Sequence, residues 1–313
     1  MSSAPALTDS PTRGHPPVGA SRAEAPPGRP EIVHDTGRAR DAAAAPVVEK
    51  PLSVAERLYN QAWLRKLVIL LVLAGLWEAY GRYLDNDLLF PTFSDTVAAF
   101  ARGIADGTLP ARAWASLKVL LMGYAAGVGL ASLLTGVAIA SRVGTDVLET
   151  LTAMFNPLPA IALLPLALIW FGLGNGSLIF VLVHSVTWAI ALNTHSGFLS
   201  VSRTLTMVGR NYGLSGPRLI GQILIPAAFP AILTGLKVGW AFAWRTLIAA
   251  ELVFGVSSGS GGLGWFIFEN KNMLDIPNVF AGLLTVILIG LVVENLIFQT
   301  IERRTIQRWG MQT

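Results

Sequence analysis

Several apolar runs, each close to 20 residues long, follow one another from Leu67 to Ile301. A transmembrane helix needs about 20 mainly apolar residues, because the hydrocarbon core of a bilayer is about 30 Å thick. The sequence is 53% hydrophobic and only 13% charged, whereas soluble domains carry about 25% charged residues. The runs therefore predict an all-α, polytopic membrane protein.

We expect about six transmembrane helices, at residues 67–83, 114–140, 147–171, 178–199, 227–254 and 277–301. In the second run, Gly123 and Gly127 form a small-xxx-small pair, which lets helix backbones approach closely. The third run contains Pro157, Pro159 and Pro165. Because proline removes a backbone donor and bends a helix, we expect this span to be interrupted next to neighbours or a water-filled cavity.

The N-terminal residues 1–52 are rich in Pro, Ala, Gly and Arg and show no hydrophobic periodicity, so we expect a disordered tail. A signal peptide needs an apolar run of roughly 7–15 residues near its start, which this stretch does not offer, so we place the tail in the cytoplasm. Lysine and arginine gather at the edges that this topology places inside, as the positive-inside rule requires. Both termini are expected in the cytoplasm, with residues 53–313 as the transmembrane domain.

The composition excludes several kinds of site. The chain has no cysteine, which excludes disulfides, thiolate catalysis and cysteine metal sites, and we predict no metal. It contains no Gly-Lys dipeptide and so no P-loop to hold ATP phosphates. The net charge of +4 follows from the positive-inside bias and does not indicate nucleic-acid binding, because no basic patch is interleaved with aromatics.

The loop at residues 201–219 is the most polar interval between two apolar runs, with three arginines and no acidic residue. Leu205, Val208 and Tyr212 recur at helical spacing, which predicts a short helix with an apolar ridge. Gly213 and the Gly-Pro pair after it are expected to end this helix. Such a loop suits a cytoplasmic segment that presses on a partner, and an ordinary basic inner loop is the alternative.

The spacing in this loop resembles the EAA loop of ABC-importer permeases. Gly213 is followed after nine residues by Ile223, and Pro226 comes three residues later. The Glu-Ala-Ala positions read Met-Val-Gly here, from Met207 to Gly209. The chain therefore lacks the glutamate of the family pattern, while the glycine and proline positions that set the shape of the loop are kept.

Further segments resemble the nitrate, taurine and aliphatic-sulfonate group of these permeases, and the likeness extends from about Leu67 to Met311. It implies an all-α, type I ABC importer permease fold, multi-pass in the bacterial inner membrane. The segments that carry it are residues 89–92, 157–166, 170–174, 224–230, 250–251, 262–264, 302–304 and 308–310.

The resemblance also implies partners and a solute. The expected partners are a second permease copy in a homodimer, a dimer of cytoplasmic ATPases carrying ATP and Mg²⁺, an extracytoplasmic solute-binding protein, and membrane lipid. No cofactor is implied on this chain. The expected solute is a small anion such as a sulfonate, taurine, nitrate or an organic acid, with an aromatic acid or a vitamin precursor as alternatives. The residues expected at the ATPase are Leu205, Val208, Gly209, Arg210, Tyr212, Gly213 and Pro226.

Arg245 and Glu251 are charges inside the fifth run, and charged residues at such depth usually face the bundle interior or a water path. They are six residues apart and so on different faces of a helix. Arg245 offers planar donors that suit a sulfonate, nitrate or carboxylate. We expect Arg245, Glu251, Trp240 and Trp244 along the solute path, with structural pairing or plain packing as the alternative.

A membrane-embedded hydrolase is the alternative from another functional class, and a scaffold or receptor is a third. A hydrolase needs a nucleophile, a base and a third group. Ser185 follows His184, but adjacent helix positions point about 100° apart, and His184 and His195 are expected to be packing residues. Residues 259–264 match G-x-G-x-x-G, but no strand precedes them, so we expect a glycine-rich outer loop at 256–275.

Overall fold

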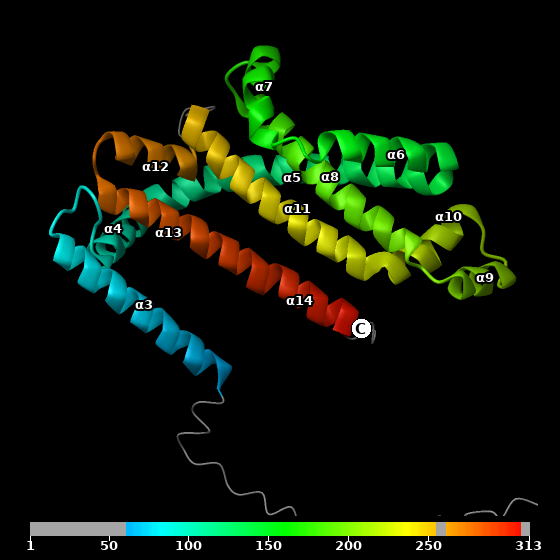
Figure 1. Cartoon of the computed structure of the whole chain (residues 1–313), viewed down its shortest axis with the longest axis horizontal. Helices are drawn as coiled ribbons and strands as arrows, with labels where there is room; N and C mark the ends of the chain where they lie inside the picture. The colour runs from blue at the N-terminus through cyan, green and yellow to red at the C-terminus, as the bar shows by residue number, and fades with distance from the viewer. Residues whose placement is uncertain (1–60, 255–260, 308–313) are drawn as a thin grey trace, which may run out of the picture. The chain divides into compact units, whose positions relative to one another are not determined.

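The computed structural model describes residues 61–254 and 261–307, and every regular element in these ranges is a helix (Figure 1). The all-α prediction is therefore confirmed for this part of the chain. The described helices belong to one compact unit, Ala62–Thr313. The expected tail at residues 1–52 lies outside the described residues.

The described chain contains long helices that are separated by one or more shorter helical elements. Element η1 is a 3₁₀-helix, whereas η2, η3 and η4 are π-helical turns that continue the α-helices beside them. In chain order the elements are α3 (Ala62–Leu84), α4 (Phe93–Ala105), α5 (Thr108–Ala140), α6 (Arg142–Phe155), η1 (Ala160–Leu163), α7 (Leu164–Phe171), α8 (Asn175–Leu199), α9 (Arg203–Asn211), α10 (Gly216–Leu219), η2 (Ile220–Leu224), α11 (Ile225–Phe254), α12 (Leu263–Asn272), α13 (Ile276–Val292), η3 (Val293–Phe298), α14 (Gln299–Glu302) and η4 (Arg303–Gln307).

Four described helical segments are long and apolar enough to cross a membrane: Thr108–Ala140, Asn175–Leu199, Gly216–Val253 and Ile276–Ile306. The pair of α6 and η1–α7 passes the same test together, so the described chain has five candidate spans if this pair counts as one. The expected first span corresponds to α3, which has 23 residues and many exposed apolar side chains. A total of six crossings stays a prediction.

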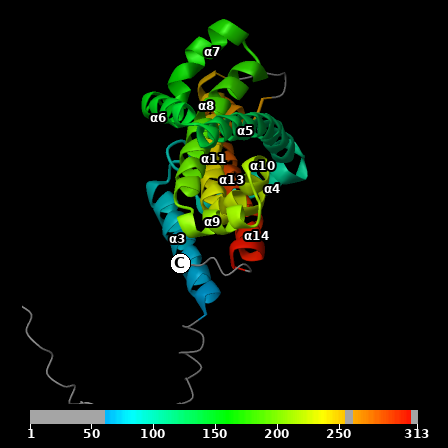
Figure 2. The same cartoon turned by 90° about the vertical axis from the view of Figure 1, so that its right-hand side faces the viewer.

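The third expected span is bent more sharply than a kinked helix, by 85°. Helix α6 ends at Phe155, η1 begins at Ala160, and α7 projects away from α6 in both views (Figures 1 and 2). Pro157 and Pro159 lie in the connection and have no N–H with which to continue α6. Pro165 was expected to interrupt the span as well, but it lies in the first turn of α7, where a missing N–H is tolerated.

Helix α8 is central to the core, because it packs against both α5 and α11. A Cβ atom added at Gly123 would lie 2.6 Å from the Cβ of Leu182, and one added at Gly127 would lie 2.6 Å from the Cβ of Val186. Real side chains do not approach so closely. The predicted small-xxx-small pair is therefore the place where the backbones of α5 and α8 meet.

Replacing Gly127 with valine is expected to destabilise the helix bundle. The added side chain would overlap Val186, and overpacking of this kind costs about 1–3 kcal/mol. Gly129 is the matched control, because it lies on the same helix and an added Cβ there has no neighbour within 4 Å. Thermal unfolding in detergent should show a lower melting temperature for Gly127→Val and little change for Gly129→Val. Equal shifts would contradict the close approach.

The prediction of a glycine-rich loop at residues 256–275 is wrong for residues 263–272, which form α12. The glycines end at Gly264, and the next eight residues contain neither glycine nor proline, so a helix can continue there. The first part of the expected loop, residues 256–260, lies outside the described residues. The first turn of α12 is held by the carboxylate of Glu251, which lies on α11.

Candidate functional site

The segment between α8 and α11 folds into the short helix α9, whose first turn is capped by Ser202. At its other end, the Leu214 N–H donates to the Gly209 carbonyl at 3.0 Å, and the Gly213 N–H donates to the Arg210 carbonyl at 2.9 Å. These two bonds form a Schellman ending, which favours a glycine with positive φ. Gly213 has φ +78°. The predicted short helix and its glycine end are confirmed.

Gly209 lies where α9 packs against α10 and η2. It is buried, and a Cβ atom added there would lie 2.7 Å from Leu219 Cδ1 and 3.1 Å from Ile223 Cγ1. A glycine at this position therefore lets α9 rest closely on α10 and η2. The contacts of α9 are therefore with the two short elements that precede α11.

Pro226 closely follows the π-helical turn that leads into α11. Because it has no N–H, it cannot donate to the carbonyl four residues back, and the regular α pattern is interrupted. The Ile225 N–H bonds instead to the Ile220 carbonyl, five residues back. Such π-turns are rare and are frequent at functional sites. The junction between α10 and α11 is thus an irregular stretch of an otherwise continuous helix.

Next to Gly209, the surface of α9 carries exposed apolar side chains. Leu205, Val208 and Tyr212 are all exposed, and Tyr212 reaches 83%. The three arginines of the segment are also exposed, and residues 201–219 contain no acid. Apolar side chains gathered on an exposed surface mark contact sites for other molecules. We call Leu205, Val208 and Tyr212 the α9 ridge.

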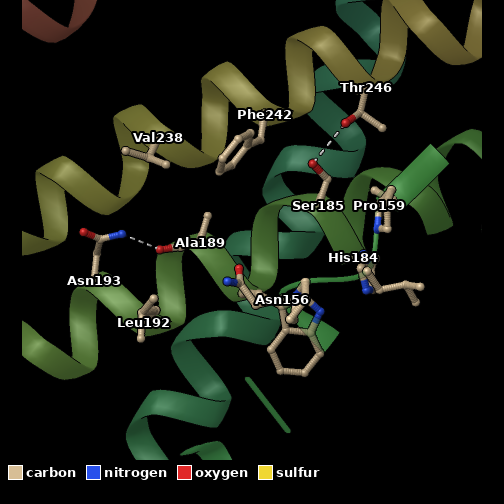
Figure 3. Close-up of a pocket in the computed structure, with 14 residues that line it drawn as sticks. Asn156, Pro159, His184, Ser185, Ala189, Leu192, Asn193, Val238, Phe242 and Thr246 are labelled. Carbon is tan, nitrogen blue, oxygen red and sulfur yellow. Dashed lines mark hydrogen bonds between the residues drawn. The ribbon is translucent and has the colours of Figure 1, made fainter. Parts of the chain in front are cut away.

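A pocket of about 370 Å³ lies where the connection after α6 meets α8 and α11 (Figure 3). Small-molecule pockets commonly have volumes of about 300–1,000 Å³. Prolines and aliphatic side chains make up much of its wall, and none of its lining residues is Asp, Glu, Lys or Arg. The polar lining residues are Asn156, His184, Ser185, Trp188, Asn193 and Thr246.

Two hydrogen bonds hold polar groups on the walls of this pocket (Figure 3). The hydroxyl oxygens of Ser185 and Thr246 lie 3.2 Å apart and join α8 to α11. The Asn193 amide donates to the Ala189 carbonyl at 2.8 Å. Ser185 is therefore bonded to Thr246, and it makes no hydrogen bond to the ring nitrogens of its sequence neighbour His184 in the described chain. The geometry gives no support to a hydrolase.

His184, Trp188 and Phe155 form an aromatic group beside the break. The rings of Phe155 and Trp188 are stacked, with centroids 5.4 Å apart, and the centroid of His184 lies 6.2 Å from that of Trp188. Within the described chain, the ring nitrogens of His184 and the indole N–H of Trp188 are buried and lack a well-formed hydrogen bond, beyond a weak interaction of His184 with the Phe155 backbone. His184 is packed, as predicted, but its polar atoms are not satisfied.

Arg245 lies beside the pocket and not in its wall. Its side chain is exposed, and its guanidinium carbon lies 5.7 Å from the ring centroid of Phe242, which lines the pocket. Trp244, by contrast, is buried in the core, and Trp240 packs edge-to-face on Tyr124 at 5.4 Å. Plain packing, the alternative left open by the sequence, therefore accounts for the environment of both tryptophans.

Glu251 is 4% exposed and holds the first turn of α12. One carboxylate oxygen accepts hydrogen bonds from the Ser116 hydroxyl at 2.8 Å and the Gly264 N–H at 2.9 Å. The Ser116 oxygen in turn accepts from the Leu263 N–H at 2.8 Å. These bonds satisfy N–H groups that a helix start leaves unpaired, and the carboxylate meets the positive end of the helix dipole. We call Glu251 and Ser116 the α12 clamp.

Sequence reasoning misses several of these residues. Trp188 had a usable signal, because it follows His184 by four residues and so shares its helix face. Asn156 directly precedes the first proline of the break, so the sequence indicates that it lies beside the break. Thr246 and Ser116 carry no such signal, because each meets its partner only through contacts between distant helices.

Residues 127–307 match the family described as "Binding-protein-dependent transport system inner membrane component". A putative ABC transporter permease protein of Methanocaldococcus jannaschii is 30% identical over 223 residues, covering 70% of this chain and 82% of the relative. The taurine transport system permease protein TauC of Escherichia coli is 30% identical, covering 65% and 72% respectively. The nitrate import permease protein NrtB of Synechocystis sp. is 28% identical, covering 80% and 90%.

Proposed function

This chain belongs to the family of binding-protein-dependent transport system inner membrane components, and from that premise we propose that it is the membrane-spanning subunit of an ATP-driven importer. It is a multi-pass ABC transporter permease of the inner membrane. ATP and Mg²⁺ would be bound by a cytoplasmic ATPase dimer. Solute would arrive from an extracytoplasmic binding protein, and a second permease copy would complete the membrane part as a homodimer.

The observation that carries this proposal is the α9 ridge. It presents apolar side chains, with exposed arginines beside them, on a helix that packs against α10 and η2 at Gly209. An ATPase that holds the ridge and moves on binding ATP would carry α9 with it. Since α9 rests on α10 and η2, this motion would reach α11 through the π-turn before Pro226. Arg210 and Gly213 would hold the end of the moving helix.

The proposed solute is a small anion. Relatives of this chain are named for taurine, aliphatic sulfonates and nitrate. Arg245 supports the same choice, because it is an exposed guanidinium beside the pocket, and its planar donors match such anions. In this proposal Arg245 lies on the solute path. Trp240 and Trp244 would stabilise the helices of the path by packing. Glu251 would stabilise them through the α12 clamp.

Replacing Val208 with aspartate is expected to weaken the ATPase complex about tenfold or more, because it places a charge in an apolar contact, and charged residues are depleted at interface cores. The measurement is co-purification of the nucleotide-binding subunit, together with the ATPase activity of the complex. Val143→Asp is the matched control, since Val143 is also an exposed valine on a helix, in the first turn of α6.

Two results would contradict the proposal. A wild-type chain that never co-purifies with a nucleotide-binding subunit would overturn the importer function itself. A Val208→Asp variant that retains the ATPase as well as Val143→Asp does would leave the importer intact and remove the α9 ridge as the contact.

A further inference from the structure

We propose that Arg203 and Arg210 form a second contact face of α9, on the flank opposite the α9 ridge, and that this face binds carboxylates of the partner ATPase. The groove that receives α9 would then have one apolar wall and one acidic wall. This inference rests on the proposed importer function and states the chemistry of the partner. We call Arg203 and Arg210 the arginine flank.

The geometry of α9 places the two arginines together and away from the α9 ridge. Successive residues of an α-helix are turned by about 100°, so Arg203 and Arg210, seven residues apart in α9, point in nearly the same direction. Arg203 and Leu205 point about 200° apart, as do Arg210 and Val208. Gly209, which packs against α10 and η2, is turned about 100° from both Val208 and Arg210. The two flanks therefore lie on either side of the packed face, and both are exposed.

The arginine flank has no acidic partner within the described chain. The salt bridges of the described residues involve Arg82, Arg112 and Lys237 as cations and neither arginine of the flank. The sequence contains no Asp or Glu from residue 150 to residue 250. The positive-inside rule accounts for arginines in a cytoplasmic loop, but it is not a net-charge rule and does not require acids to be missing. A partner surface of opposite charge would complement this flank.

The partner that fits is the protein that holds the α9 ridge, because the two flanks are close together. α9 lies at one end of the described helices (Figure 1). A helix with its side chains is about 10–12 Å wide, so a groove that receives α9 has a wall against each flank. Such a wall takes the two arginines out of water, which is costly unless they are paired.

Carboxylates are the groups that this wall would supply. The planar donors of a guanidinium bind the two oxygens of a carboxylate at once. Lipid phosphates offer similar oxygens, but a helix that lies on a membrane buries only one of its faces there. With the α9 ridge held by the ATPase, Asp or Glu side chains of the same protein would pair with the arginine flank.

The test measures binding of the nucleotide-binding subunit that co-purifies with the wild-type chain to the full-length chain in nanodiscs of neutral phosphatidylcholine. Arg210→Glu should weaken binding at least about tenfold at low salt, mainly through slower association, because complementary charges speed encounter. At about 1 M salt, where the Debye length is about 3 Å, wild type and variant should bind almost equally. Arg142→Glu is the matched control and should bind as wild type does, since Arg142 is also an exposed arginine, in the first turn of α6.

A cross-link tests the contact directly. Arg210→Lys keeps the positive charge, and a carbodiimide joins the introduced amine to a carboxylate in contact with it by an amide bond. The carbodiimide takes up the water that is lost and leaves as a urea. Mass spectrometry of peptides should find position 210 joined to an Asp or Glu of the nucleotide-binding subunit, and Arg142→Lys should give no such product. This measurement decides the matter if Arg210→Glu fails to fold.

The outcomes separate this inference from the proposed function. If Arg210→Glu binds the subunit as tightly as Arg142→Glu at low salt, or if position 210 gives no product with the subunit, the acidic wall is wrong and the importer function stands. An effect of Arg210→Glu that is confined to nanodiscs with anionic phosphatidylglycerol would assign the arginines to lipid and also overturn the inference. If no nucleotide-binding subunit binds the wild-type chain, the importer function itself fails.

Discussion

A Gly213→Val variant is expected to lose most of its ATP-driven uptake. Gly213 has φ +78° and closes the Schellman ending of α9, and a β-branched residue is a genuine outlier at positive φ. Residues held in such sparsely populated conformations cost about 1–3 kcal/mol. At about 2 kcal/mol the native turn would be populated roughly thirtyfold less, since 1.4 kcal/mol is a factor of ten. The α9 ridge would then no longer be held in place.

The measurement is uptake and ATP hydrolysis by the reconstituted complex. Gly213→Asn is the matched control, because asparagine adopts positive φ far more readily than valine does, and an added Cβ at this position has no neighbour within 4 Å. The asparagine variant should therefore keep most of its uptake. If valine and asparagine lower uptake equally, the backbone conformation is not the cause, and a direct contact of Gly213 with the partner would be the better explanation.

The second large effect is expected at the α12 clamp. In a Glu251→Leu variant, the Ser116 hydroxyl and the Gly264 N–H lose their acceptor inside the protein. Each buried donor left unpaired costs about 1–3 kcal/mol, so we expect a loss of about 3 kcal/mol and release of the first turn of α12. Thermal unfolding and proteolysis near Leu263 would report this loss.

Glu251→Gln separates a clamp from a charge on the solute path. The glutamine oxygen can accept from both Ser116 and Gly264, so the clamp is kept while the charge is removed. We therefore expect nearly wild-type stability and uptake from Gln, and the large loss only from Leu. If Gln stops uptake without lowering the melting temperature, the negative charge itself is needed, and Glu251 acts directly on the solute path.

Local sequence patterns were a good guide where the determining contacts are local. The end of α9 follows from Gly213, which acts within the last turn of the same helix. The pair Gly123 and Gly127 predicted a close helix approach, because small residues four apart share a face. Those patterns could not name α8 as the partner helix or Leu182 and Val186 as the side chains in contact.

The same limit explains the elements that were predicted less well. Pro157 and Pro159 predicted an interruption, but the 85° bend depends on where α7 packs. α12 was expected as loop because the stretch is rich in glycine, and the Glu251 and Ser116 side chains that hold its helix start lie on other helices. Ser116 and Glu251 are 135 residues apart in the chain, so no window of sequence contains both.

The sequence by itself determined the all-α membrane architecture, the family, and the basic loop with its glycine-ended helix, because hydropathy, helix capping and turn conformation depend on residues a few positions apart. Only the tertiary structure decided which polar side chains meet. It joined Ser185 of α8 to Thr246 of α11, placed both in the wall of one pocket, and buried Glu251 against α12. Hydrogen bonds act over about 3 Å, so such partners are known only once the helices are packed.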